Sequence, residues 1–115
     1  MHELPATQGI LDVALDAARD AGAVRVTSID VVVGDLTSFV DDSVQFYFDV
    51  LSRGTPAEGA VLRMLRRRGI ARCSSCAESY EVTPPLEPVC ARCGSFAIDI
   101  TGGREFYIDS IEVDE

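Results

Sequence analysis

The chain has 115 residues, 47% of them hydrophobic, and a formal net charge of −9 at pH 7. A chain of this length can bury one modest core, whereas its acidity disfavours binding to a phosphate backbone and no apolar run approaches the ~20 residues of a membrane-spanning helix. Its beginning, Met1-His2-Glu3-Leu4-Pro5, has neither the basic region nor the apolar run of an export signal. We therefore expect a soluble, cytoplasmic protein.

Residues 7–21 predict a helix, because apolar side chains recur there at helical spacing on one face: Ile10, Leu11, Ala14, Leu15 and Ala18. Asp12, Asp16 and Asp20 fall four residues apart on another face. We interpret them as solvated side chains, because hard-metal sites draw their ligands from converging elements. Gly22 is placed to end the helix.

A strand and a second helix are predicted next. Residues 24–33 are β-branched and apolar over most of their length, which predicts a strand covered on both sides. Residues 41–52 carry apolar side chains at helical spacing, with Asp41 or Asp42 placed to cap the start. We expect the aromatic run Phe46-Tyr47-Phe48 to pack in the core.

Two more strands are predicted over residues 60–65 and 105–113, with every cysteine of the chain between them. The sequence therefore predicts an α/β (α+β) fold in which a small three-stranded sheet and two helices carry an inserted, zinc-ribbon-like four-cysteine subdomain. The expected boundaries are 1–70 and 99–115 for the discontinuous main domain and 71–98 for the insertion.

Half of the ten basic residues are clustered where the second predicted strand leaves the core: Arg63, Arg66, Arg67, Arg68 and Arg72. They could form a docking patch for an acidic partner surface. Solvated charge at the end of a strand is the favoured interpretation, because such charges commonly protect exposed strand edges.

The four cysteines form two Cys-x-x-Cys pairs, Cys73/Cys76 and Cys90/Cys93, separated by thirteen residues. Two such pairs can direct four thiolates at one tetrahedral ion, and a closed all-cysteine shell is typical of structural zinc. Two disulfides would need an oxidising compartment, and a dithiol redox role would need only one pair. A single iron ion uses the same ligands, and the spacing does not exclude it.

The only histidine, His2, lies beside the amino terminus. Its imidazole, its own backbone nitrogen and a neighbouring nitrogen could form the fused chelate rings that suit square-planar Ni(II) or Cu(II). Taken alone, this pattern is weak, because a terminal histidine is more often frayed.

Five features in chain order resemble the HypA/HybF hydrogenase nickel-incorporation family, and the resemblance covers essentially the whole chain. They are Met1-His2-Glu3-Leu4, Gly34-Asp35-Leu36, Val44-Gln45-Phe46-Tyr47-Phe48, the two cysteine pairs and Ile108-Asp109-Ser110-Ile111-Glu112-Val113. This sequence differs from some members of that family in having no histidine directly after either cysteine pair.

The resemblance implies a metallochaperone, not an enzyme, that carries Ni(II) as cargo to the large subunit of [NiFe]-hydrogenase with a nickel-delivering GTPase partner. It implies that His2 is the principal nickel ligand, that Glu3 supports that site, and that Zn(II) is structural. The implied zinc ligands are Cys73, Cys76, Cys90 and Cys93. We expect a monomer or weak homodimer that binds neither nucleic acid nor membrane. The alternative is a zinc-ribbon module for protein interaction or nucleic-acid binding, with no nickel role.

Overall fold

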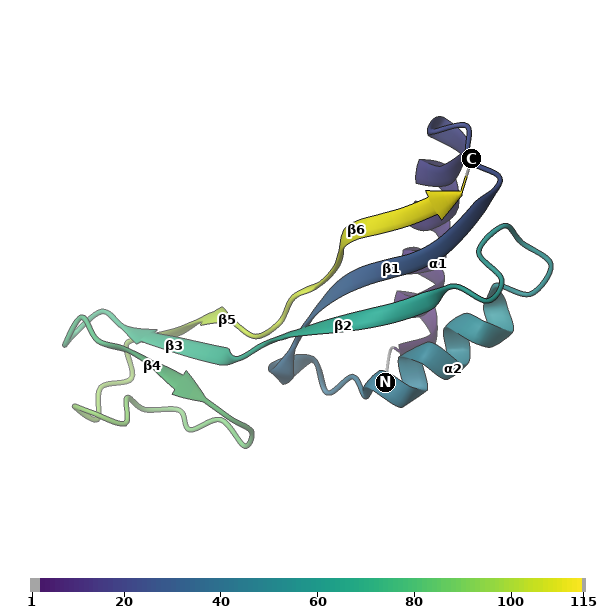
Figure 1. The fold of residues 1–115 in the computed structure, drawn as a ribbon. Helices are drawn as coiled ribbons and strands as arrows, with labels where there is room; N and C mark the ends of the chain where they lie inside the picture. Colours follow the sequence, from purple (N-terminus) through teal and green to yellow (C-terminus); the bar gives the residue numbers. More distant parts are fainter. Residues whose placement is uncertain (1–2, 115) are drawn as a thin grey trace. The chain divides into compact units, whose positions relative to one another are not determined.

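The structure is a computed structural model, and it describes residues 3–114. Figure 1 shows the elements in chain order. They are α1 (Glu3–Asp20), β1 (Arg25–Gly34), the short 3-10 helix η1 (Asp35–Thr37), α2 (Asp41–Leu51), β2 (Val61–Arg67), β3 (Gly69–Cys73), β4 (Ser79–Val82), β5 (Ile98–Gly102) and β6 (Phe106–Asp114). The chain divides into two compact units, the second made of residues 33–38 and 66–105 and the first of the remainder.

The first unit is organised around a three-stranded sheet in the order β2-β1-β6. β6 runs antiparallel to β1, because the amide of Val24 donates to the carbonyl of Asp114 at 2.9 Å and Thr27 Oγ1 donates to the carbonyl of Glu112 at 3.1 Å. Figure 1 shows that β2 runs in the same direction as its neighbour β1 and that α2 lies in the connection between them. This arrangement confirms the predicted three-stranded sheet with two helices.

The central strand β1 supplies much of the core of the first unit. Its β-branched side chains are almost fully buried: Val26, Ile29, Val31, Val32 and Val33. A strand with a neighbour on each edge and cover on both faces has little room for polar side chains. The prediction of a strand covered on both sides is therefore confirmed.

α1 buries one stripe and ends at a glycine, as its sequence predicts. Ile10, Leu11, Ala14 and Ala18 are buried. Asp12, Asp16 and Asp20 are exposed, as expected of a solvated face. After the helix, Gly22 adopts a φ of 68° and the amide of Ala23 donates to the carbonyl of Ala18 at 2.9 Å. This is the left-handed termination that glycine favours.

Two expectations for α2 are wrong. The residue before the helix is Val40, which has no side-chain cap, while Asp41 and Asp42 lie within the first turn. In the aromatic run, only Phe48 is fully buried. Phe46 points to solvent, with 62% of its surface exposed. Successive helical residues are rotated by about 100°, so three adjacent aromatic side chains cannot share one face.

The second unit contains a separate sheet in the order β4-β3-β5, which the sequence did not predict. β3 pairs antiparallel with both neighbours, and the first cysteine of the motif, Cys73, pairs with Ile98 at the end of the ladder. These strands have 4 or 5 residues each, and their burial alternates only weakly. Short strands of this kind give little periodic signal in a sequence.

Residues 33–38 join the second unit through close backbone contacts. The amide of Gly34 donates to the carbonyl of Glu105 at 2.8 Å, and the amide of Leu36 donates to the carbonyl of Gly103 at 2.7 Å. A Cβ atom on Gly34 would lie 2.1 Å from the backbone of Gly103, and Gly103 itself has a φ of 110°. Both positions therefore require glycine.

Three of the five clustered arginines pair with acidic side chains: Arg63 with Asp30 and Glu112, Arg66 with Asp35, and Arg68 with Glu81. These exposed pairs favour the interpretation of the cluster as solvated charge on strands. Within the described residues 3–114, neither helix combines the length and the apolar character that a membrane crossing needs.

Candidate metal centre

The two cysteine pairs adopt the same local turn. In the first, the amide of Cys73 donates to the carbonyl of Glu78 at 2.9 Å; in the second, the amide of Cys90 donates to the carbonyl of Ser95 at 2.7 Å. Each bond therefore spans five residues. Each turn also has a left-handed residue four positions after its first cysteine, Ala77 with φ 63° and Gly94 with φ 76°. The repeated spacing in the sequence therefore encodes two equivalent turns.

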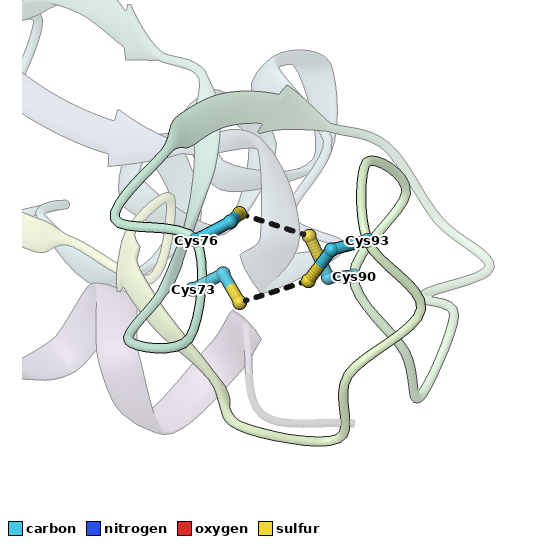
Figure 2. A group of neighbouring side chains, drawn as sticks. All are labelled: Cys73, Cys76, Cys90 and Cys93. Carbon is cyan, nitrogen blue, oxygen red and sulfur yellow. Dashed lines mark hydrogen bonds between the residues drawn. The ribbon is translucent and has the colours of Figure 1, made fainter.

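The two turns bring all four sulfur atoms together, as Figure 2 shows. Every pair of ligand atoms lies within 4.8 Å. The Sγ atoms of Cys73 and Cys93 are 3.7 Å apart, and those of Cys76 and Cys90 are 3.8 Å apart. A tetrahedral ion with metal–sulfur bonds of about 2.3 Å separates its sulfurs by about 3.8 Å. The cluster thus has the dimensions of a tetrathiolate metal site.

The cysteines are free thiols, because a disulfide would need sulfurs about 2.05 Å apart. The pairs across the site also come from different turns, Cys73 with Cys93 and Cys76 with Cys90. The disulfide alternative therefore has no support in the structure. Zinc and a single iron ion both fit the geometry.

The environments of the thiols give them different acidities. Desolvation opposes ionisation of Cys90, but hydrogen bonds from the amides of Arg92 and Cys93 outweigh it and lower the pKa of Cys90 to about 6. At Cys93 the amide of Ser95 favours the thiolate, yet desolvation and bonds to the other cysteines outweigh it and raise the pKa of Cys93 to about 12. A metal that binds all four sulfurs must displace the Cys93 proton, so binding should weaken as the pH falls.

The expected nickel site is only partly within the described residues. His2 lies outside them, and Glu3 is the first residue described. The side chain of Glu3 is buried, with 9% of the residue exposed, and its Oε2 accepts a hydrogen bond of 2.7 Å from the amide of Val40. The carbonyl of Glu3 accepts a bond of 2.6 Å from Thr7 Oγ1. The start of α1 is thus fixed next to the start of α2.

One residue that contacts the cysteine turns was missed in the sequence. Tyr80 lies on β4, and its hydroxyl oxygen accepts a hydrogen bond of 3.0 Å from the amide of Ala91, inside the second cysteine turn. A tyrosine four residues after Cys76 does not by itself predict this contact. The contact forms only because the folded chain brings the second cysteine turn next to β4.

Comparison with known families decides the relationship. The sequence profile described as "Hydrogenase/urease nickel incorporation, metallochaperone, hypA" matches residues 1–113. The chain belongs to the HypA family. Among curated HypA relatives, hydrogenase maturation factor HypA of Caldanaerobacter subterraneus subsp. tengcongensis is 40% identical over 115 residues, covering 99% of this chain and 100% of the relative. The Chlorobaculum tepidum factor is 35% identical over 114 residues, covering 99% and 100%.

Solved HypA structures share the fold. The solution structure of the Ni metallochaperone HypA from Helicobacter pylori aligns with a TM-score of 0.70 at 19% identity, covering 99% of this chain and 98% of that one. A second solution structure of a HypA protein aligns with a TM-score of 0.73 at 20% identity, covering 98% and 96%. The resemblance to the HypA/HybF family and the predicted fold class are both confirmed.

Proposed function

We propose that this protein is a nickel metallochaperone for the maturation of [NiFe]-hydrogenase. The observation that carries the proposal is the family match over residues 1–113, which includes the Met1-His2-Glu3 start and both cysteine pairs. In this role the protein is a carrier and not an enzyme. It receives Ni(II) and delivers it to the hydrogenase large subunit together with a GTPase partner.

Nickel binds at the amino terminus in this proposal. The imidazole of His2 and adjacent main-chain nitrogens are the ligands, because fused chelate rings of nitrogen donors suit Ni(II). Glu3 supports the site by position, since its buried carboxylate accepts the Val40 amide and so fixes the residue that follows His2. A few nitrogen ligands at a chain end can be exchanged one at a time, which suits a carrier that must release its cargo.

The tetrathiolate site holds structural Zn(II) in this proposal, with Cys73, Cys76, Cys90 and Cys93 as ligands. Sulfur separations of 3.7 and 3.8 Å across the site support it. Four thiolates leave no open coordination position, so the ion takes no part in nickel transfer. The absence of disulfides among these four cysteines is typical of cytosolic proteins, which supports a cytoplasmic location.

Calorimetric titration with Ni(II) tests the nickel role. The samples are the untagged parent, His2→Ala, and a form extended before Met1, which converts the terminal amine to an amide. We expect tight nickel binding by the parent, its loss in His2→Ala and weaker binding by the extended form, with zinc content equal in all three. Nickel affinity that is unchanged in His2→Ala would contradict the proposal.

The second candidate is a zinc-ribbon module that binds another protein, and the four-cysteine cluster alone favours it. In that case His2 is incidental, and the parent, His2→Ala and the extended form respond alike to nickel. The same titration therefore separates the two functions.

A further inference from the structure

Tyr80 connects the two halves of the metal centre. It lies on β4, half-buried, opposite Ala71 of β3, and β3 ends in the first ligand, Cys73. Its hydroxyl oxygen accepts a hydrogen bond of 3.0 Å from the amide of Ala91, the residue directly after the third ligand, Cys90. The contact therefore joins the sheet that carries the first cysteine turn to the second cysteine turn.

We propose that Tyr80 is a positioning residue for the metal centre, and that its hydroxyl holds the second cysteine pair against the sheet so that bound zinc is released slowly. The inference rests on zinc occupancy of the tetrathiolate site, which is part of the function proposed above. It adds a role for a residue that does not itself ligate the ion.

The position of the contact explains how it acts on the ligands. Tyr80 fixes the peptide between Cys90 and Ala91, and the next amide along the chain, that of Arg92, donates to Cys90 Sγ at 3.3 Å. Amide bonds to sulfur stabilise the thiolate that a metal requires. Losing the Tyr80 contact would free this peptide to rotate and would weaken the alignment of the Arg92 amide with its sulfur.

Two other contacts join the turns, and they are exposed, as the hydrogen bond to Tyr80 is. Ser75 Oγ and Ser95 Oγ lie 2.9 Å apart at an exposed position. Arg92 and Glu78 are 3.9 Å apart, with both side chains more than half exposed. Each of these pairs must order two flexible side chains, so it usually adds little. Tyr80 differs because a rigid ring on a strand presents its hydroxyl to a backbone amide.

Zinc leaves a tetrathiolate site as its thiolate ligands detach, and movement of one cysteine pair away from the other speeds this loss. A hydrogen bond that joins the two turns resists that movement. Tyr80→Phe removes the hydroxyl and keeps the ring, so the ligands and the sheet are retained. We expect zinc release to a chelator to become about fivefold faster, which corresponds to the net contribution of one hydrogen bond between neutral groups.

The experiment compares four forms of the full chain: the parent, Tyr80→Phe, Tyr107→Phe and Val82→Ala. Tyr107 is half exposed on β6 in the first unit, so its variant controls for loss of a tyrosine hydroxyl. Val82 lies on β4 opposite Gly69, at the end of β3 that is away from Cys73, so its variant controls for general weakening of that strand. Zinc content per chain is measured first, followed by the rate of zinc transfer to a chromophoric chelator at fixed pH.

Hydrogen exchange at the Ala91 amide provides a second readout that a general loss of stability would not reproduce. We expect a protected Ala91 amide in the zinc-loaded parent, and accelerated exchange together with faster zinc release only in Tyr80→Phe. Release from Tyr80→Phe at the parental rate, equal acceleration in Val82→Ala, or an unprotected Ala91 amide in the parent would each overturn the proposal. Absence of zinc from the parent would instead overturn the zinc assignment itself, and this inference with it.

Discussion

The carboxylate of Glu3 accepts a hydrogen bond of 2.7 Å from the backbone amide of Val40, the residue that precedes α2. Val40 has no side-chain cap of its own, so a residue 37 positions earlier satisfies an amide at the start of the helix. A carboxylate is also stabilised near the positive end of a helix. The contact ties the residue after His2 to the second helix.

The first prediction concerns this contact. Glu3→Ala should lower the free energy of unfolding by about 1–2 kcal/mol, because it removes the acceptor of a partly buried hydrogen bond at the start of α2. Glu3→Gln should cost less, because its amide oxygen can still accept the bond. Denaturant unfolding of the zinc-loaded protein measures both values. If Glu3 supports nickel binding by position, Glu3→Gln also retains more nickel affinity than Glu3→Ala; equal losses in the two variants would point to the charge instead.

The second prediction uses two phenylalanines of α2 as a matched pair. Phe48→Ala should destabilise the protein by about 3–5 kcal/mol, because a fully buried ring leaves a cavity. Phe46→Ala should change the stability by less than about 0.5 kcal/mol, because 62% of Phe46 is exposed. Denaturant unfolding measures both values, from the midpoints of variants whose unfolding free energy depends equally steeply on denaturant concentration. Similar losses from the two substitutions would contradict the observed orientation of α2.

The third prediction concerns the acidic residues around Arg63. The hydrogen bond from Arg63 lowers the pKa of Asp30 below its ordinary value. At Glu112 the hydrogen bond from Ser28 is the main cause and Arg63 adds to it, so the pKa of Glu112 is also lowered. Because the folded-state pKa values are lowered, the stabilisation is fully present above the ordinary carboxyl pKa values. It is lost as the pH falls through the folded-state values.

Arg63→Met should therefore raise the pKa of Asp30 toward its ordinary value and reduce the dependence of stability on pH in the acid range. Carboxyl chemical shifts followed through a pH titration report the pKa directly. Arg67→Met serves as the control, because Arg67 is exposed and its guanidinium donates to the backbone carbonyl of Arg66 at 3.4 Å. A titration of Asp30 that is identical in the parent and Arg63→Met would rule out the ion pair in solution.

The fourth prediction tests the tetrathiolate site by removing one ligand. Cys90→Ser should reduce bound zinc to well below one equivalent and unfold the second unit first, because binding free energy of a structural metal contributes to folding. Elemental analysis gives the metal content, and amide exchange identifies the region that opens. Ser74→Ala is the control, since it alters the first turn without removing a sulfur. Iron in place of zinc in the parent would identify the site as a single-iron centre.

The sequence by itself determined the features that depend on neighbouring residues. The spacing of Cys73/Cys76 and Cys90/Cys93 was sufficient to predict a four-sulfur cluster, because each turn is closed by a bond across five residues. The apolar stripe of α1 and the β-branched run of β1 predicted those elements for the same reason, since periodicity is a local property. The family resemblance also followed from the sequence, as the match over residues 1–113 confirms.

Contacts between distant parts of the chain were decided only by the tertiary structure. The sequence placed Asp41 or Asp42 at the start of α2, whereas the amide of Val40 bonds to Glu3. It also did not reveal that Tyr80 reaches the amide of Ala91. In both contacts the acceptor is a side chain whose bonding partner the sequence does not indicate. The donor in each contact is a backbone amide, and every residue except proline has one. Only the tertiary structure therefore determines which amide lies close enough to bond.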